Sequence, residues 1–444
     1  MKNIWIGIDD TDSTSGGCTT YIARLIIEKL IKKYDIIGFP RLVRLNPNVP
    51  WKTRGNGAIS FQVGIGDKKK IKIGNISGSD IFSCVNLKSD LYDVDVSYVK
   101  SIVDQTIKNF SKMDDENTNP GFVLLKQKPN FSLYDKAVKK IVLIDDIIDL
   151  LNDLDADFLG YKNKRGLIGA ASSIAWDSKI DKTYELITYR NNENWGKKRF
   201  VDNESVKFID KSITSTFDNF DYVNNHNRIM PNSPCPILYG IRGDDFDDLK
   251  KSLSIVKSEF VNSYIIFETN QGTDDHLVTK NISEIRHFES VIIKGTVVEK
   301  PITIKGGHVF FKVKDEHGII DCAAYEPTKD FRDIIRELYV GDLVKVYGGV
   351  RQNPLTVNIE KLQVIKLVKI KKKIENPICS KCNKHMKSIG KDQGYRCKTC
   401  GDKSSDSVFT EINRKIKTGY YEVPVCARRH LSMPLKRYKK LSKS

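Results

Sequence analysis

The first twenty residues constrain the fold of this chain more than any other stretch. Ile4 to Ile8 is an apolar run with the length and composition of a buried strand. Three carboxylates follow within four residues, on Asp9, Asp10 and Asp12, and hydroxyl side chains and two glycines come next. From Tyr21 onward, apolar residues recur at the spacing of a helix. Strand, acidic turn, glycine loop and helix in this order predict an α/β domain.

The acidic turn also predicts a site for a metal-bound phosphate. Carboxylate oxygens bind hard cations such as Mg²⁺, and unpaired backbone N–H groups at the start of a helix bind anions. Without a cation, Asp9, Asp10 and Asp12 would repel one another. The alternative interpretation is a surface turn in which a Ser or Thr caps the helix.

A basic glycine loop at residues 51–57 follows a second predicted strand. Lys52 and Arg54 precede a Gly-x-Gly sequence, which fits either a loop that contacts phosphate or a simple hairpin turn. The strand before this loop carries Arg41 and Arg44. These four cations could offset the charge of a bound phosphate.

Length and composition favour a soluble protein of several domains. The chain has 444 residues, whereas a single core seldom grows beyond about 250–300 residues. Apolar residues make up 40% of the chain and charged residues 29%, and no apolar run approaches the roughly 20 residues that cross a bilayer. No signal peptide is visible, so we expect a cytoplasmic protein with no membrane partner. Nine cysteines, an odd number, argue against a disulfide framework.

The positive charge is concentrated at the C-terminal end. From Lys366 onward there are 22 Lys and Arg against six Asp and Glu, which gives +16 of the total net charge of +17. A nearly neutral body with a cationic end indicates a polyanion partner, and nucleic acid is the best candidate. A solvated tail is the alternative.

The middle of the chain predicts a second, smaller domain. A strand from Pro236, a helix over 244–258 and a strand over 264–270 fit a ferredoxin-like α+β unit. Residues 64–95 are polar and irregular, so we expect a surface loop there, and residues 191–213 read as a linking segment. Residues 131–190 could belong to either domain.

Residues 287–370 carry the pattern of an OB-fold. Three predicted strands, a helix and two further strands follow in that order over about 80 residues. The run "GDLVKVYGGV" at 341–350 is typical of the fourth strand of such a barrel. We therefore expect a nucleic-acid-binding β-barrel.

Four cysteines predict a zinc ribbon. Cys379 and Cys382 form one C-x-x-C pair, and Cys397 and Cys400 form another after fourteen residues. Two such knuckles present four thiolates to one tetrahedral Zn²⁺, which leaves no open position and makes the ion structural. Basic residues on the ribbon are candidates for contact with phosphate: Lys381, Lys384, Lys387, Arg396 and Lys398.

The last residues interleave basic and aromatic side chains. Arg428 and Arg429 lie in this segment, and such a mixture suits RNA because rings stack on bases while cations meet the backbone. The alternative is that the aromatic side chains pack back on the ribbon.

Two other functions fit part of the sequence. Asp10-Thr-Asp12-Ser-Thr14 matches the D-x-D-x-T loop of haloacid-dehalogenase-type phosphatases, with Asp10 as nucleophile and Asp12 as general acid, but that class predicts neither an OB-fold nor a ribbon. A non-enzymatic protein that binds nucleic acid through its OB-fold and zinc modules would leave the aspartates without a role. Mg²⁺-dependent ATP turnover stimulated by RNA would separate these possibilities.

Motifs along the whole chain resemble the archaeal tRNA agmatinylcytidine synthetase family, TiaS. They include the two C-x-x-C pairs and the runs "GIDDTDSTSGGCTT", "GFPRLVRLNPNVPWKTRGNGA", "TNPG", "RGLIGA", "CPILYGIRG", "GGHVFF", "AAYEPTKDFR" and "YEVPVCARRHLSMPL". The resemblance implies a multidomain α/β and α+β protein. The expected divisions are a kinase-like domain at 1–190, a ferredoxin-like domain at 191–286, an OB-fold at 287–370, a zinc ribbon at 371–403 and a basic tail at 404–444.

The resemblance further implies an ATP-dependent carbon–nitrogen ligase with agmatine as co-substrate. Its RNA partner would be the isoleucine tRNA with a CAU anticodon, whose wobble cytidine is phosphorylated at the C2 oxygen and then takes agmatine, so that it reads AUA. Such enzymes cleave ATP to AMP and pyrophosphate, and the γ-phosphate activates the cytidine.

The family's site residues carry over to matching positions here. Asp9, Asp10 and Asp12 would be catalytic and bind Mg²⁺, and Thr19 would be autophosphorylated. The implied contacts to ATP or phosphate are Thr11, Ser13, Gly17, Cys18, Thr20, Arg41, Arg44, Lys52, Arg54 and Asn56.

Overall fold

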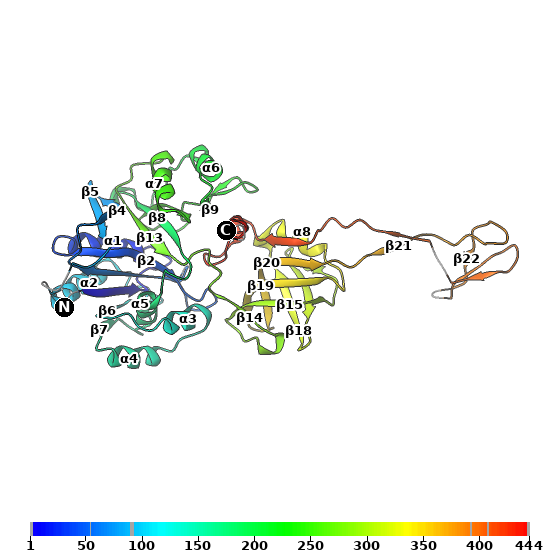
Figure 1. Ribbon diagram of the computed structural model, residues 1–444, viewed down its shortest axis with the longest axis horizontal. Coiled ribbons are helices and arrows are strands. Elements are labelled where there is room, and N and C mark those ends of the chain that lie inside the picture. Colours follow the sequence, from blue (N-terminus) through cyan, green and yellow to red (C-terminus); the bar gives the residue numbers. More distant parts are fainter. Residues whose placement is uncertain (1–2, 54, 89–92, 391–392, 406–407, 442–444) are drawn as a thin grey trace.

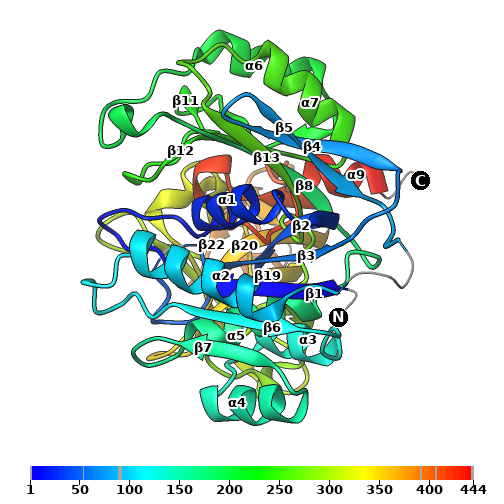
Figure 2. The same ribbon diagram turned by 90° about the vertical axis from the view of Figure 1, so that its left-hand side faces the viewer.

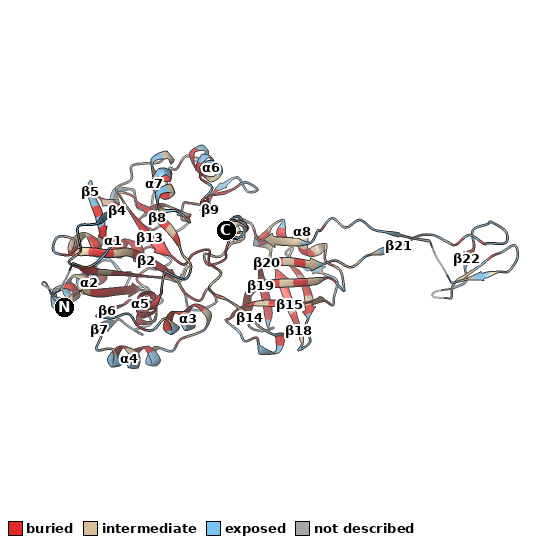
Figure 3. Cartoon of the chain, viewed as in Figure 1, coloured by how far each residue is buried: buried red, intermediate tan, exposed pale blue. Residues whose placement is uncertain are grey.

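The protein has a broad α/β body, a β-barrel beside it and a small ribbon at the end of a long arm (Figure 1). The structure is a computed structural model and describes residues 3–53, 55–88, 93–390, 393–405 and 408–441. Within these residues, no helix is both long and apolar enough to pass through a membrane. Buried residues concentrate in the body and the barrel, whereas the arm and ribbon are mostly exposed (Figure 3).

One eleven-stranded sheet runs through the whole body, in the order β7-β6-β1-β3-β2-β5-β4-β13-β8-β12-β9. Its strands are β1 (Asn3–Asp9), β2 (Asp35–Arg44), β3 (Gly57–Gly64), β4 (Lys70–Ile76), β5 (Ser79–Cys84), β6 (Gly121–Leu125), β7 (Asp157–Gly160), β8 (Thr183–Tyr189), β9 (Thr216–Phe217), β12 (Ile237–Gly243) and β13 (Ser263–Thr269). The helices are α1 (Thr19–Leu30), α2 (Val96–Phe110), α3 (Ser132–Lys139), α4 (Ile144–Asp153), α5 (Gly166–Ala175), α6 (Asn203–Ser212) and α7 (Phe246–Ile255). A small hairpin, β10 (Phe220–Asp221) and β11 (His226–Asn227), and a 3-10 turn, η1 (Asn192–Asn194), complete the body.

The kinase-like and ferredoxin-like parts share this sheet because β13 bridges them. It pairs antiparallel with β8 and β4 and parallel with the end of β2, where Glu268 lies opposite Arg41. Helix α4 lies at one end of the body and α6 and α7 at the other (Figure 2). Strands of the two domains are therefore hydrogen-bonded into one continuous sheet.

Strand β1 separates two hydrophobic cores by its alternation. Ile4, Ile6 and Ile8 join the core under α1 and α2, whereas Trp5 joins the core under α3, α4 and α5. Asp9 shares the face of Trp5 and so comes out beneath α5. This alternation places the first carboxylate of the acidic turn against a helix rather than in solvent.

Two segments that we expected to be irregular contain regular structure. Within residues 64–95, β4 and β5 form a hairpin whose turn residues Ser77 and Gly78 have positive φ angles of 49° and 89°, as a type I′ turn requires. Within residues 191–213, the helix α6 begins at an N-cap, Asp202, whose carboxylate accepts a hydrogen bond from Ser205 N at 2.8 Å. The surface loop predicted at 64–95 is a strand hairpin over residues 70–84, and the linking segment predicted at 191–213 contains a helix, because tertiary pairing and packing outweigh the polar local composition.

The second half of the chain contains the predicted OB-fold and ribbon. The barrel strands are β15 (Ser290–Val297), β17 (Val309–Lys314), β18 (Ile319–Ala324), β19 (Leu343–Arg351) and β20 (Thr356–Lys366), with α8 (Phe331–Arg336) before β19. The barrel closes through β15–β17 and through a parallel β18–β20 pair. Short elements surround it: β14 (Leu277–Thr279), β16 (Ile302–Thr303), η2 (Ile282–Glu284) and η3 (Glu326–Thr328). The arm and ribbon consist of β21 (Lys371–Glu375), β22 (Lys387–Ser388), β23 (Tyr395–Arg396), β24 (Lys403–Ser404) and β25 (Val408–Glu411).

After the ribbon, the chain returns to the body. Strand β26 (Gly419–Glu422) pairs with β20 of the barrel, and η4 (Val425–Ala427) and α9 (Leu435–Leu441) follow. The buried Arg437 side chain binds Asp181 and Asp244 at 2.5 and 2.6 Å. The C-terminal segment thus joins the barrel to the body, and it packs on these two parts rather than on the ribbon.

Candidate active site

A cavity of about 560 Å³ lies where the two halves of the body and the C-terminal segment meet. Its walls come from segments that are far apart in the sequence: the acidic turn, the start of α1, the end of β2, the loop at 51–57, the start of α5, strands β8 and β12, the segment 228–237 and His430. The acidic turn predicted from sequence therefore faces a real cavity and is not a surface turn.

The carboxylate of Asp9 fits against α5 only because residue 169 is glycine. A Cβ atom at Gly169 would overlap Asp9 Oδ2 and would lie 2.6 Å from Asp9 Cγ. Burial, and then the neighbouring charge of Asp10, raise the pKa of Asp9 well above its usual range. A cation beside these groups would favour their ionised form.

Asp10 is held by a positive φ of 57° and by a charged partner. Arg165, at the start of α5, donates from Nη2 and Nε to Asp10 Oδ2 at 3.1 and 3.2 Å, and also to the Asn117 carbonyl oxygen at 2.8 Å. Burial raises the pKa of Asp10, and Arg165 opposes that rise. Asp12 lines the same cavity, with its backbone carbonyl accepting a hydrogen bond from Thr118 Oγ1 at 2.8 Å.

Thr19 is the first residue of α1 and lines the cavity beside the aspartates. Its Oγ1 accepts a hydrogen bond from Thr11 Oγ1 at 3.0 Å, and both threonines are buried. Cys18 and Thr20 also line the cavity, and the Cys18 side chain at the N-cap makes no capping hydrogen bond. The backbone N–H groups at this helix start can therefore bind an anion.

Another part of the cavity lining, which we call the basic end, is rich in cations. Arg44, Lys52, Arg228 and Arg242 line it. Two arginines share one carboxylate, that of Glu185: Arg44 Nη2 lies at 4.0 Å and Arg242 Nε at 3.7 Å. Burial lowers the pKa of Arg44, and the Nε atom of this side chain is buried without a hydrogen-bond partner among the described residues. Arg242 Nη1 also lies 3.6 Å from Asp218 Oδ2, so the four cations outnumber the two carboxylates beside them, and this excess suits a phosphate group.

His430 reaches this basic end from the C-terminal segment. The charge of Arg44 and then burial hold the pKa of His430 well below its usual range, so that the imidazole is neutral. Its Nδ1 is buried, and no described residue lies within hydrogen-bond reach of that atom. A neutral imidazole can accept or donate a hydrogen bond to a ligand without adding to the positive charge.

The remaining predicted phosphate ligands lie in different places. Lys52 and Asn56 line the cavity, whereas Arg54 falls outside the described residues. Arg41 does not line the cavity: it lies 4.6 Å from the ring of Trp5 and donates to the Trp176 carbonyl oxygen at 2.8 Å.

Ser13, Ser15 and Gly17 belong to the acidic turn but do not line the cavity. Ser13 and Ser15 share a side-chain hydrogen bond of 2.7 Å, and Gly17 has a φ of 76°.

Several residues that line the cavity could not be assigned to this site from the sequence, although Arg165 and the glycines after it fitted either an anion site or a plain capped helix. Arg165, Gly169, Glu185, Arg242 and His430 lie far apart in the sequence, and no spacing relates them to the acidic turn. The runs "RGLIGA", "CPILYGIRG" and "YEVPVCARRHLSMPL" contain four of them and are the signals from which they could have been found.

The ribbon brings its four cysteines together as predicted. Their sulfur atoms all lie within 4.8 Å of one another, and among the described residues this is the group with the geometry of a metal site. The donor set of four thiols fits a structural Zn²⁺.

The predicted tRNA contacts divide into two groups. The ribbon residues are exposed: Lys381, Lys384, Lys387, Arg396 and Lys398. Arg428 and Arg429 are instead engaged within the protein. Arg428 pairs with Asp218 and, at 2.8 Å, with Glu422, and Arg429 pairs with Glu360 at 3.2 Å.

These features define an enzyme that carries out phosphate chemistry and binds nucleic acid. A cavity lined by carboxylates, a threonine and several arginines suits chemistry on a phosphorylated substrate, and the attached OB-fold and ribbon are modules that bind nucleic acid. Family models agree part by part: the TiaS TCKD domain matches residues 5–163, the TiaS FLD domain 164–276, an OB-fold nucleic acid binding domain 291–365 and the TiaS C-terminal zinc ribbon domain 376–416.

Relatives and solved structures match over nearly the full length. The isoleucine-tRNA 2-agmatinylcytidine synthetase TiaS of Methanocaldococcus jannaschii is 43% identical over 445 residues, covering 98% of this chain and 99% of that protein. A complex of TiaS with its isoleucine tRNA and ATP matches with a TM-score of 0.84 at 40% identity, and a complex of TiaS with that tRNA, AMPCPP and agmatine matches with 0.82 at 37%; each match covers 98% of both chains. The chain therefore belongs to the TiaS family. The family and the four kinds of module predicted from sequence are confirmed, and neither the phosphatase nor the non-enzymatic alternative is favoured.

Proposed function

We propose that this chain is an ATP-dependent ligase that joins agmatine to C2 of the wobble cytidine of the CAU-anticodon isoleucine tRNA. The observation that carries this proposal is that one cavity is lined by the acidic turn, by Thr19 and by a cluster of arginines. Support comes from a relative that forms a complex with its isoleucine tRNA, an ATP analogue and agmatine. We propose the cytoplasm as its location.

The reaction needs a better leaving group than the oxygen on C2. In the proposed sequence, this oxygen takes a phosphoryl group from ATP, the primary amine of agmatine attacks C2, and the oxygen departs with phosphate. The residues of the acidic turn fit Mg²⁺, because half-buried carboxylates whose pKa is raised gain from a cation, and Mg²⁺ needs only one or two carboxylates when phosphates and waters supply the rest. When bound, Mg²⁺ would neutralise phosphate charge.

The chain's own groups orient the reactants. Asp9, Asp10 and Asp12 are the proposed Mg²⁺ ligands, and Arg165 fixes the Asp10 carboxylate. Thr19 is the proposed site of autophosphorylation, since its hydroxyl lines the cavity and accepts a hydrogen bond from Thr11. The basic end around Arg44 would bind phosphate oxygens of ATP or of the tRNA backbone.

The decisive experiment is incubation with ATP, agmatine and unmodified isoleucine tRNA, followed by mass analysis of the wobble nucleoside. We expect the mass of the cytidine to rise by that of agmatine less one water. A tRNA whose wobble cytidine is replaced by uridine is the matched control and should remain unmodified. If the wobble cytidine of the natural tRNA keeps its mass, the proposal is wrong.

Loss of the ribbon's metal should weaken tRNA binding without acting directly on the cavity that binds the small substrates. Cys382→Ser removes one of four thiols, so we expect the protein to lose about one bound zinc ion per chain and to bind tRNA at least about tenfold more weakly, since the exposed lysines of the ribbon lose their fixed positions. Metal analysis and tRNA titration measure both effects. The control is Cys426→Ser, a half-buried cysteine away from the cluster. Unchanged zinc content in Cys382→Ser would contradict the prediction.

A further inference from the structure

One wall of the cavity is the proline-rich segment 231–237, which runs into β12 at Ile237 and accepts a hydrogen bond from Arg190 N at the Pro236 carbonyl oxygen, at 3.1 Å. Three of its seven residues are prolines, which have no backbone N–H group to donate. Pro231, Asn232, Ser233, Cys235 and Ile237 all line the cavity. The segment comes from the ferredoxin-like part and faces the acidic turn of the kinase-like part: a Cβ atom at Gly16 would lie 3.5 Å from the Pro234 carbonyl oxygen. The segment therefore lies close to the acidic turn.

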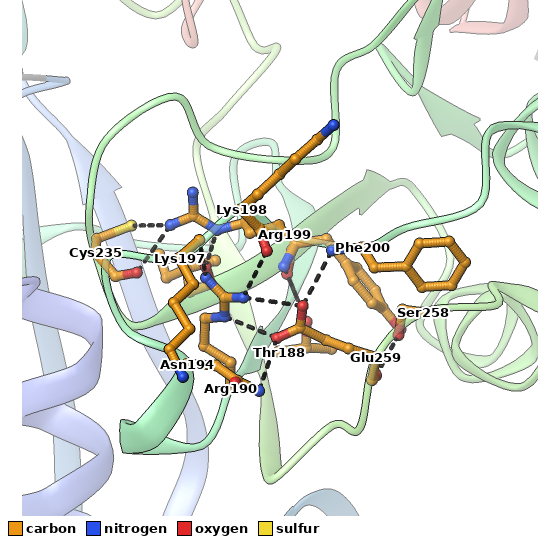
Figure 4. Close-up of polar contacts among 12 residues, drawn as sticks. Thr188, Arg190, Asn194, Lys197, Lys198, Arg199, Phe200, Cys235, Ser258 and Glu259 are labelled. Carbon is orange, nitrogen blue, oxygen red and sulfur yellow. Dashed lines mark hydrogen bonds and ion pairs between the residues drawn. The ribbon is translucent and has the colours of Figure 1, made fainter.

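The guanidinium of Arg199 binds this wall, and Figure 4 shows its contact with Cys235. Its Nε donates to the Ile237 carbonyl oxygen at 2.8 Å and its Nη1 to that of Pro231 at 3.0 Å. Its Nη2 donates to the carbonyl oxygens of Ser233 and Cys235, both at 2.8 Å. Four carbonyl groups of one segment thus converge on one planar side chain, and Arg199 itself does not line the cavity.

A second layer fixes the backbone that carries Arg199. Arg190, which is almost fully buried, binds Glu259 through Nε at 2.8 Å and Nη2 at 2.9 Å. It also donates to the carbonyl oxygens of Lys197 and Lys198 at 2.8 and 3.3 Å. The same carboxylate accepts the backbone N–H of Phe200 at 3.0 Å. The backbone on both sides of Arg199, at Lys198 and Phe200, is therefore hydrogen-bonded to the ion pair between Arg190 and Glu259.

The wall suits a cationic amine better than a phosphate. Phosphate requires donors, which the cavity supplies around Arg44 and at the start of α1. The segment 231–237 contains no Lys or Arg and faces the acidic turn, whose carboxylates attract an ammonium or a guanidinium.

We infer that Arg199 is a positioning residue that holds the 231–237 wall at the distance that the amine co-substrate needs. This inference depends on the proposed function, because agmatine is the amine. Lysine cannot replace Arg199, since an ammonium has three donors without a planar fork and cannot reach four carbonyl groups at once. The role is separate from tRNA binding, which we assign to the barrel and ribbon.

The test is steady-state kinetics on the full chain with unmodified isoleucine tRNA, ATP and labelled agmatine. For Arg199→Lys we expect the KM for agmatine to rise about tenfold or more, while the KM for ATP and the Kd for tRNA change less than about threefold. Glu259→Gln, which weakens the outer layer only, should shift the KM for agmatine in the same direction by a smaller factor. The matched control is Lys198→Ala, whose exposed side chain is next to Arg199 in the sequence.

The outcomes separate the two proposals. If the wild-type protein transfers agmatine and folded Arg199→Lys keeps the wild-type KM for agmatine, the inference is wrong while the proposed function stands. Equal loss of affinity for agmatine, ATP and tRNA would also overturn it, because that pattern indicates general destabilisation. If Arg199→Lys does not fold, Glu259→Gln decides in the same way. Absence of agmatine transfer by the wild-type protein would overturn the proposed function itself.

Discussion

Gly169→Ala is expected to lower kcat/KM for agmatine transfer about 10²-fold or more while leaving tRNA binding unchanged. The added methyl group would overlap Asp9 Oδ2, so the carboxylate has to rotate away from its place in the cavity. Strand β1 and helix α5 approach closely here, since a Cβ atom at Gly7 would overlap the Ala170 carbonyl oxygen, and moving them apart to make room would break this close packing. A misplacement of about 1 Å at a catalytic group commonly costs about 10²-fold in rate.

The measurement is the initial rate of agmatine incorporation, together with titration of tRNA against the variant. Ser172→Ala on the same helix is the control: its hydroxyl is buried without a hydrogen-bond partner among the described residues, so its loss should leave both rate and stability close to wild type. Wild-type rates for Gly169→Ala would show that Asp9 is not needed at its present position.

The parts of the fold that depend on local pattern could be predicted from the sequence. The barrel strands and the two cysteine pairs are each encoded within about 80 residues or fewer, and the structure contains both. The acidic turn could be predicted for the same reason, since Asp9, Asp10 and Asp12 are neighbours. The continuous sheet could not be predicted, because the pairing of β13 with β4 joins residues nearly 190 positions apart.

The basic residues that line the cavity could not be predicted from the sequence either, because tertiary packing decides which of them reach it. Arg41 and Arg44 are three positions apart on β2, so they point to opposite faces and only one can reach the cavity. Composition cannot tell which one does, because the answer depends on α5 covering the face of Arg41. His430 arrives from a segment that looked like a free RNA-binding tail, and only the return of the chain along β20 brings it to the cavity.

Asp12→Asn is expected to lower agmatine transfer by about 10²–10³-fold, the size expected when one charged group that stabilises the transition state is lost. The same change should keep or raise the Tm measured without Mg²⁺. The Asp12 charge contributes to the raised pKa of both Asp9 and Asp10, so the folded protein carries a repulsion that the amide removes. Mg²⁺ should then stabilise the variant less than it stabilises the wild-type protein.

Thermal unfolding in EDTA and in excess Mg²⁺, measured beside transfer rates and tRNA affinity, tests this combination. Asp114→Asn makes the same change in charge on an exposed residue of a neighbouring loop and should alter none of these quantities. A folding role for Asp12 would instead lower the Tm of Asp12→Asn and weaken tRNA binding together with turnover. An Asp12→Asn variant that is inactive but as stable as the wild-type protein would show that the carboxylates lie together in order to bind a cation and its phosphate. Their mutual repulsion then lowers the stability of the folded protein.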